Sequence, residues 1–151
     1  MNFPTVDEDF LQRRDDFIKS GDYSDEMFDL ARDFAAADTI VIAAPLWDFS
    51  FPASLKQYFE LINVLGLTFV YSEDGTPQGL CKAEKLYYVM TSGGSNVPEE
   101  YGYGYVKALA QGFYGIRETV IFKAEGLDIV GADVEGTLLE AENRIDTAIG
   151  H

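Results

Sequence analysis

The sequence predicts an α/β fold in which a parallel sheet is covered by helices. Three short apolar runs alternate with segments whose apolar residues recur at helical spacing, and this alternation is typical of parallel sheets. The apolar runs cover residues 39–44, 85–91 and 119–123. Three strands are few for such a sheet, and the chain opens with a helical pattern rather than a strand.

Composition limits the class of protein. The 151 residues, 47% of them hydrophobic, suit one domain, 1–151, with its own core. One cysteine, Cys81, excludes an internal disulfide and favours a cytoplasmic location. A net charge of −15 makes nucleic acid and anionic membranes poor partners. We expect no membrane-spanning helix, no signal peptide and no zinc site, since one Cys and one terminal His cannot form a typical one.

The stretch 39–60 organises the chain. Residues 39–44 are uncharged and rich in β-branched side chains, which predicts a fully buried strand. Pro45 ends this strand because proline cannot donate a ladder hydrogen bond. Pro52 suits the start of a helix, which we expect to end near Gly66. Apolar residues share one face of that helix: Leu55, Tyr58, Phe59 and Ile62.

The remaining elements follow from spacing and caps. Ser24 is the expected N-cap of a helix that runs to about Ala37. Thr68 to Tyr71 have β character within a turn-rich excursion. Further helices are expected at 9–19, at 106–113, and, with an amphipathic pattern, from Asp133 to Ala148.

Two loops follow the first two predicted strands, at the end where open α/β sheets bind ligands. The first contains Trp47 and Phe49, and the second is the run 92–95, made of Ser and Gly. Such loops suit a flat, π-rich ligand, because the rings offer apolar surface and glycine lets backbone N–H groups approach closely. In the alternative interpretation the rings belong to the core and the glycines only turn the chain. Composition alone favours that alternative.

No other catalytic pattern is present. The only histidine, His151, is the last residue, so a catalytic triad is excluded, and neither a P-loop nor GxGxxG occurs. Cys81 has no basic partner of fixed geometry, and we interpret it as a packing residue rather than a nucleophile. The carboxylates form no obvious acid/base pair.

Taken together, these segments resemble a known family, the flavodoxin-like NAD(P)H dehydrogenases (quinone) and FMN-dependent NADH-azoreductases. Residues 35–56 match the family's strand, flavin loop and following helix. Thr91 to Gly94 match its second flavin loop. Shorter matches are Gly66–Phe69, Tyr71, Gly75, Gly79–Leu80, Gly112–Ile116 and Ala124–Gly126. The resemblance covers nearly all of the chain in the right order.

The resemblance implies a flavodoxin-like three-layer sandwich and hydride transfer from NADH or NADPH, through FMN, to quinones or azo compounds. It places two groups beside the flavin: Pro45, Leu46, Trp47, Asp48 and Phe49 along the isoalloxazine ring, and Ser92, Gly93 and Gly94 at its pyrimidine side. It implies that Tyr71 and Phe113 line the pocket of a small planar acceptor, from the partner subunit of a homodimer. No side chain need act as an acid or base.

Two departures from the family matter. Trp47-Asp48 stands where the family commonly has Tyr-Asn, and a carboxylate at Asp48 is expected to lower the flavin potential. The family's first strand, Ser-rich phosphate loop, helix and second strand have no counterpart here, so we expect an N-terminally truncated fold with strand 39–44 at an edge that invites dimerisation.

Alternative functions remain open at this point. A truncated homologue with weak or no flavin binding could act as an interaction or vestigial domain. A third hypothesis is a flavodoxin-like binding protein that binds no nucleotide. It is the least favoured, because it explains neither the aromatic loop nor the Ser/Gly loop.

Overall fold

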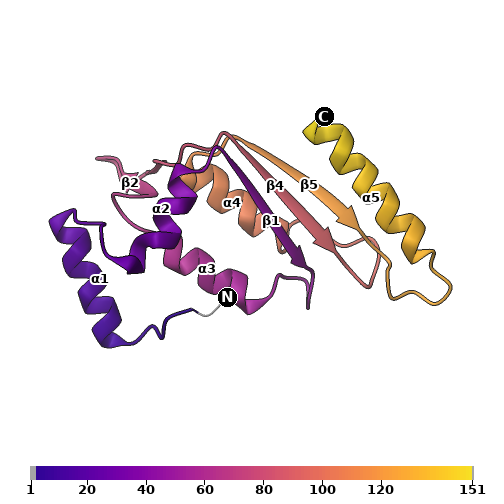
Figure 1. Ribbon diagram of the computed structural model, residues 1–151, viewed down its shortest axis with the longest axis horizontal. Helices are drawn as coiled ribbons and strands as arrows, with labels where there is room; N and C mark the ends of the chain where they lie inside the picture. The colour runs from indigo at the N-terminus through magenta and orange to yellow at the C-terminus, as the bar shows by residue number, and fades with distance from the viewer. Residues whose placement is uncertain (1–2, 151) are drawn as a thin grey trace.

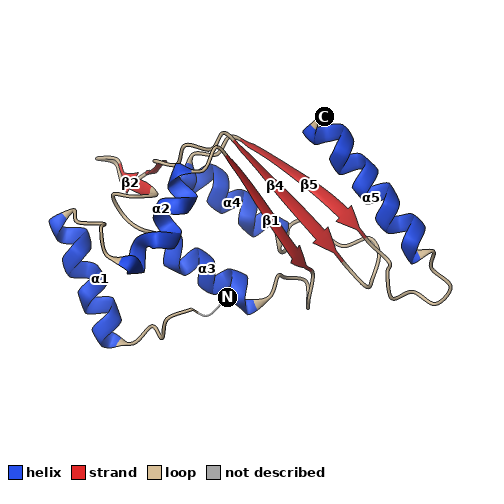
Figure 2. Ribbon diagram, in the orientation of Figure 1, coloured by secondary structure: helices blue, strands red, loops and turns tan. Residues whose placement is uncertain are grey.

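Three parallel strands form the central sheet of this computed structural model, which describes residues 3–150 (Figure 2). The strands β1 (Thr39–Pro45), β4 (Lys85–Thr91) and β5 (Glu118–Ala124) lie in the order β1-β4-β5. Each position of β1 pairs with one of β4, and each of β4 with one of β5, over their whole length. The predicted parallel sheet is therefore confirmed.

Helices lie on both sides of this sheet (Figure 1). One side carries α2 (Asp29–Ala36), α3 (Ala53–Ile62) and α4 (Tyr103–Leu109), and the other carries α5 (Val134–Ile149). The helix α1 (Glu8–Ser20) lies farther out, beyond α2. This layering confirms the prediction of an α/β sandwich with helices on both faces of a parallel sheet. No helix within residues 3–150 combines the length and the apolar character needed to cross a membrane.

The expectation that strand 39–44 is fully buried is wrong. Ile40, Ile42 and Ala44 are buried, whereas Thr39, Val41 and Ala43 are exposed. The helix α5, which lies on the side of the sheet opposite α2, α3 and α4, packs against β5 at the far end of the sheet. The face of β1 on that side therefore has no helix over it. Among residues 3–150, this strand lies at an edge of the sheet, as predicted.

Two helix boundaries also differ from expectation. The helix α3 ends at Ile62, four residues before Gly66, because Thr68 forms a local backbone turn. The buried Thr68 hydroxyl donates to the Ile62 carbonyl at 2.7 Å and accepts from the Val64 amide at 3.0 Å. Farther upstream, Asp25 and not Ser24 is the cap: it accepts from the Met27 amide and begins the 3₁₀ turn η1 (Glu26–Phe28) that leads into α2.

A small antiparallel hairpin, β2 (Phe69–Tyr71) and β3 (Pro77–Gly79), lies beside the amino ends of the strands (Figure 1). It contacts the π-helical turn η2 (Ala110–Tyr114), which continues α4. Gly79 makes this contact possible, because a Cβ there would lie 2.0 Å from the Tyr114 carbonyl carbon. At Gly79 the hairpin and η2 thus meet backbone against backbone.

Replacing Gly79 tests this contact. We expect Gly79→Ala to lower the free energy of unfolding by about 1–3 kcal/mol, because the added methyl group forces β3 and η2 apart. The matched control is Gly112→Ala on η2, where a Cβ meets no atom within 4 Å. Urea denaturation followed by circular dichroism measures both variants, and equal midpoints would contradict the close approach.

Candidate functional site

Two loops leave the sheet side by side. Pro45 at the end of β1 is paired with Thr91 at the end of β4. The Leu46 amide extends the ladder by donating to the Thr91 carbonyl at 2.8 Å. The aromatic loop and the Ser/Gly loop therefore begin next to each other at the carboxyl ends of adjacent strands, as the sequence predicts.

The aromatic loop, residues 46–50, is a tight turn that presents its rings outward. Trp47 and Ser50 exchange backbone hydrogen bonds of 2.6 and 2.8 Å, and the two residues between them have positive φ. Asp48 has φ +50° and Phe49 has φ +64°, conformations that non-glycine residues rarely adopt. The side chains of Trp47 and Phe49 are 62% and 61% exposed, so the interpretation that they belong to the core is wrong.

The Ser/Gly loop, residues 92–95, is fastened to a third loop that the sequence reasoning missed. The amides of Gly126, Leu127 and Asp128 donate to the carbonyls of residues 94, 92 and 93, at 2.9 to 3.1 Å. The Ser92 hydroxyl also donates to the Gly94 carbonyl at 2.7 Å. The signal for this third loop was available, because it follows the third predicted strand at the same end of the sheet.

Backbone donors remain available in both loops. No hydrogen bond within residues 3–150 uses the amides of Asp48, Phe49, Gly93 or Gly94. Gly94 is exposed, and a Cβ built on it meets no atom within 4 Å. By contrast, Gly93 lies close against Asp128. The loops thus offer free N–H groups and flat aromatic surface to a ligand with acceptors along its rim.

An open aromatic cleft adjoins the first loop. This cleft is a cavity of about 780 Å³ beside Phe49. Its walls also include Phe51, Lys56, Tyr101 and Tyr105. A separate cavity of about 490 Å³ lies along α1. The rings of Phe49 and Tyr101 are 5.8 Å apart. The hydrogen bond from Lys56 to Glu60 raises the pKa of the Lys56 amine, so this side chain keeps its charge in an ion pair.

The chain does not bring Tyr71 and Phe113 to these loops. Both rings pack on Phe69, with centroid distances of 5.4 and 4.9 Å. This cluster belongs to the hairpin and to η2, which lie toward the amino ends of the strands, whereas the two loops leave their carboxyl ends (Figure 1). Within one chain, the residues expected to line the substrate pocket are therefore remote from the candidate site.

Cys81 lies outside both loops. Its thiol is partly buried and lies 3.6 Å from the Thr68 carbonyl. Burial raises the pKa of the Cys81 thiol to about 11, which suits a packing residue rather than a nucleophile. Within residues 3–150, no group of three or more His, Cys, Asp or Glu side chains could hold a metal ion.

Comparison with known proteins gives consistent matches. A family model described as flavodoxin-like fold matches residues 1–149. The chain is 40% identical over 144 residues to an FMN-dependent NADH:quinone oxidoreductase of Lachnoclostridium phytofermentans, covering 90% of this chain and 71% of that protein. It is 38% identical over 149 residues to one of Clostridium perfringens, covering 93% of this chain and 72% of that protein.

A solved structure has the same fold. The crystal structure of an FMN-dependent NADH-azoreductase from Bacillus anthracis in complex with FMN superposes with a TM-score of 0.79 at 27% identity. The match covers 98% of this chain and 74% of the azoreductase chain.

The pKa of Cys81 predicts slow alkylation. With a pKa of about 11, we expect iodoacetamide to modify the folded protein at pH 8 at least tenfold more slowly than the unfolded chain, whose thiol has a pKa of roughly 8.5. The rate should rise with pH toward 11, because the thiolate is the reactive form. Mass spectrometry after timed quenching measures it. Equal rates in folded and urea-unfolded protein would show that Cys81 is more accessible than the structure indicates.

Proposed function

The chain belongs to the flavodoxin-like family of FMN-dependent NADH:quinone oxidoreductases, and from this premise we propose that it uses FMN to pass hydride from NADH or NADPH to quinones or azo compounds. The observation that carries the proposal is the pair of neighbouring loops with outward rings and free amides. We propose that Pro45–Phe49 and Ser92–Gly94 hold the flavin.

The loops fit an isoalloxazine ring in their chemistry. The flavin has a flat aromatic face and a rim of carbonyl oxygens and ring nitrogens, which accept hydrogen bonds. Trp47 and Phe49 offer exposed apolar surface to such a face, and the free amides of the two loops offer donors to such a rim. Gly94 leaves room for a ring to approach the backbone closely.

When bound, FMN supplies the hydride chemistry, and the protein's part is to bind and orient it. In this chain, the backbone amides would fix the edge of the ring, while the aromatic side chains exclude water from its face. Among residues 46–50 and 92–95, Asp48 is the one side chain with a carboxyl or amino group, and it is exposed. We therefore assign the side chains to binding and electrostatics rather than to acid/base catalysis.

The two flavin loops offer no cationic side chain to the flavin phosphate. Neither flavin loop contains Lys or Arg, and residues 126–128 contain none. Lys56, which lines the adjoining cleft, is already paired with Glu60. We therefore propose that the ring system contributes most of the binding free energy, with an affinity in the micromolar range.

We propose that the protein acts as a homodimer of single flavodoxin-like domains in the cytoplasm, without nucleic acid or membrane as a partner. The dimer would bring Tyr71 and Phe113 of the partner subunit over the flavin, to line the pocket for a planar electron acceptor. The remoteness of these rings from the loops of their own chain supports this arrangement, as does the 53% exposure of Tyr71.

A flavin titration tests the site directly. We expect saturable quenching of FMN fluorescence on adding the purified protein, and riboflavin should bind within about threefold of FMN, because no loop cation contacts a phosphate. Gly94→Val should weaken binding at least tenfold, whereas Gly112→Ala on η2 should leave it unchanged. The rate of NADH oxidation with a quinone as acceptor should likewise fall in Gly94→Val and stay unchanged in Gly112→Ala. No quenching with hundreds of micromolar protein would overturn the proposed function.

Asp48 should tune the bound flavin. We expect Asp48→Asn to raise the FMN midpoint potential by on the order of 30 mV, because removing a carboxylate relieves repulsion of the charge gained on reduction. Spectroelectrochemical titration of both proteins measures the shift. Asp16→Asn, on the exposed side of α1, is the control variant. Equal potentials in wild type and Asp48→Asn would count against any electrostatic role for Asp48.

A further inference from the structure

One wall of the aromatic cleft beside Phe49 comes from residues 98–105, which form the turn before α4 and its first residues. Gly102 lets this wall approach the aromatic loop. It has φ +54°, and a Cβ built on it would lie 3.3 Å from a methyl carbon of Leu46. Two segments far apart in the sequence therefore meet at the cleft, and Tyr101 lies next to Phe49.

Four aromatic rings line the cleft. Phe51 is buried and forms its floor, and the Tyr105 ring lies 5.6 Å from that of Phe51. Phe49, Tyr101 and Tyr105 are exposed, so their rings are accessible to a ligand. Aromatic faces attract positive charge, and this chain already uses one in that way: the Lys56 ammonium lies 5.8 Å from the centroid of the Tyr105 ring.

The charges that line the cleft are mainly negative. Asp48 and Glu100 are both exposed, and within residues 3–150 neither forms an ion pair. Lys56 is the one basic residue among those that line the cleft, and its charge is neutralised by Glu60. A ligand in the cleft therefore meets aromatic rings and two carboxylates without partners.

We propose that the aromatic cleft binds flat organic cations in preference to anions of the same shape. The rings of Phe49 and Tyr101 would contact the flat part of such a ligand, and its positive charge would lie near Glu100. This inference goes beyond the proposed function, because it assigns a ligand class to the cleft itself. A ligand held there would lie beside the loops proposed to hold the flavin, since Asp48 and Phe49 line both.

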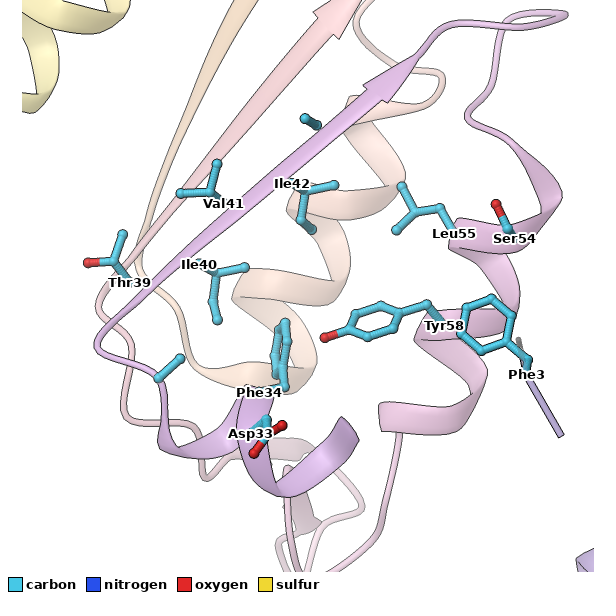
Figure 3. Close-up of a pocket in the computed structure, with 12 residues that line it drawn as sticks. Phe3, Asp33, Phe34, Thr39, Ile40, Val41, Ile42, Ser54, Leu55 and Tyr58 are labelled. Atoms are coloured by element: carbon cyan, nitrogen blue, oxygen red, sulfur yellow. The ribbon is translucent and has the colours of Figure 1, made fainter. Parts of the chain in front are cut away.

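The net charge of −15 attracts cations to the whole molecule, so this long-range attraction has to be separated from recognition by the cleft. A groove of about 550 Å³ between β1 and α3 provides the comparison (Figure 3). Asp33 lines this groove, and none of the groove's lining residues lines the cleft. Neutralising Asp33 therefore removes the same charge as neutralising Glu100, but at a different cavity.

The test uses two azo dyes of the same shape and opposite charge. Both are para-dimethylaminoazobenzene, with either a trimethylammonium or a sulfonate group at the para position of the second ring. The full chain is used without flavin, in roughly 0.15 M salt, where a Debye length of about 8 Å screens long-range attraction. Trp47, the single tryptophan, reports binding through its fluorescence, and equilibrium dialysis verifies the dissociation constants. We expect the ammonium dye to bind at least tenfold more tightly than the sulfonate dye.

Charge variants locate this preference. We expect Glu100→Gln to reduce it about threefold and Glu100→Lys about tenfold, because the carboxylate beside the bound cation is removed or replaced by a positive charge. Asp33→Asn, which changes the net charge by the same unit as Glu100→Gln, should leave the preference unchanged.

Ring variants test the aromatic contact. Tyr101→Ala should weaken the ammonium dye at least fivefold, because one of the exposed rings is lost. Tyr101→Phe keeps the ring and should bind this dye as the wild type does. Circular dichroism melting verifies that each variant folds.

Three outcomes would overturn the proposal. They are equal affinity for the two dyes, a preference that Glu100→Lys leaves unchanged, and the same loss of preference in Asp33→Asn as in Glu100→Gln. The last result would assign the attraction to the net charge alone. Because no flavin is present, the result is independent of FMN binding, and a protein that binds the ammonium dye but not FMN would contradict the proposed function only.

Discussion

The register of the parallel ladder is the constraint on which the candidate site depends. Pro45, Thr91 and Ala124 stand opposite one another across the three strands, so three loops leave the sheet at one level. Backbone bonds continue past the strand ends, from the Leu46 amide to Thr91 and from the Ser92 amide to Ala124. A slip of one residue would invert every face of a strand and separate the loops. The site is thus secured by backbone pairing before any loop side chain contributes.

The sequence predicts this arrangement well where a local pattern determines the outcome. Apolar runs bounded by charged residues or proline place the strands within a residue or two, and the rule for strand ends then places both loops. The sequence does not reveal that the run from Thr39 to Ala44 is covered on one face only, because burial depends on which helix packs over which strand. Likewise, Thr68 ends α3 early through bonds to Ile62 and Val64, contacts that helical periodicity does not encode.

The aromatic loop shows why composition alone misleads. A Trp and a Phe in a short loop suit a core, yet both rings are mostly exposed because the backbone between Trp47 and Ser50 turns through positive φ. Asp48 and Phe49 pay a conformational cost there that glycine would avoid. Two backbone hydrogen bonds close this turn, and the turn holds the apolar rings outward although water then surrounds them. That arrangement is understandable if a flat ligand covers the rings, and it supports the flavin assignment.

Pro45 marks the point where β1 gives way to the aromatic loop. Since the Leu46 amide points to β4, position 45 belongs to the same series as Thr39, Val41 and Ala43, whose amides point away from β4. A proline at this position therefore removes an N–H that the ladder to β4 does not use. Because the next amide, that of Leu46, still donates to the Thr91 carbonyl, the ladder continues past the proline and holds the start of the aromatic loop beside the start of the Ser/Gly loop. The chain can thus end the strand at Pro45 without losing the backbone bond that keeps the two loops together.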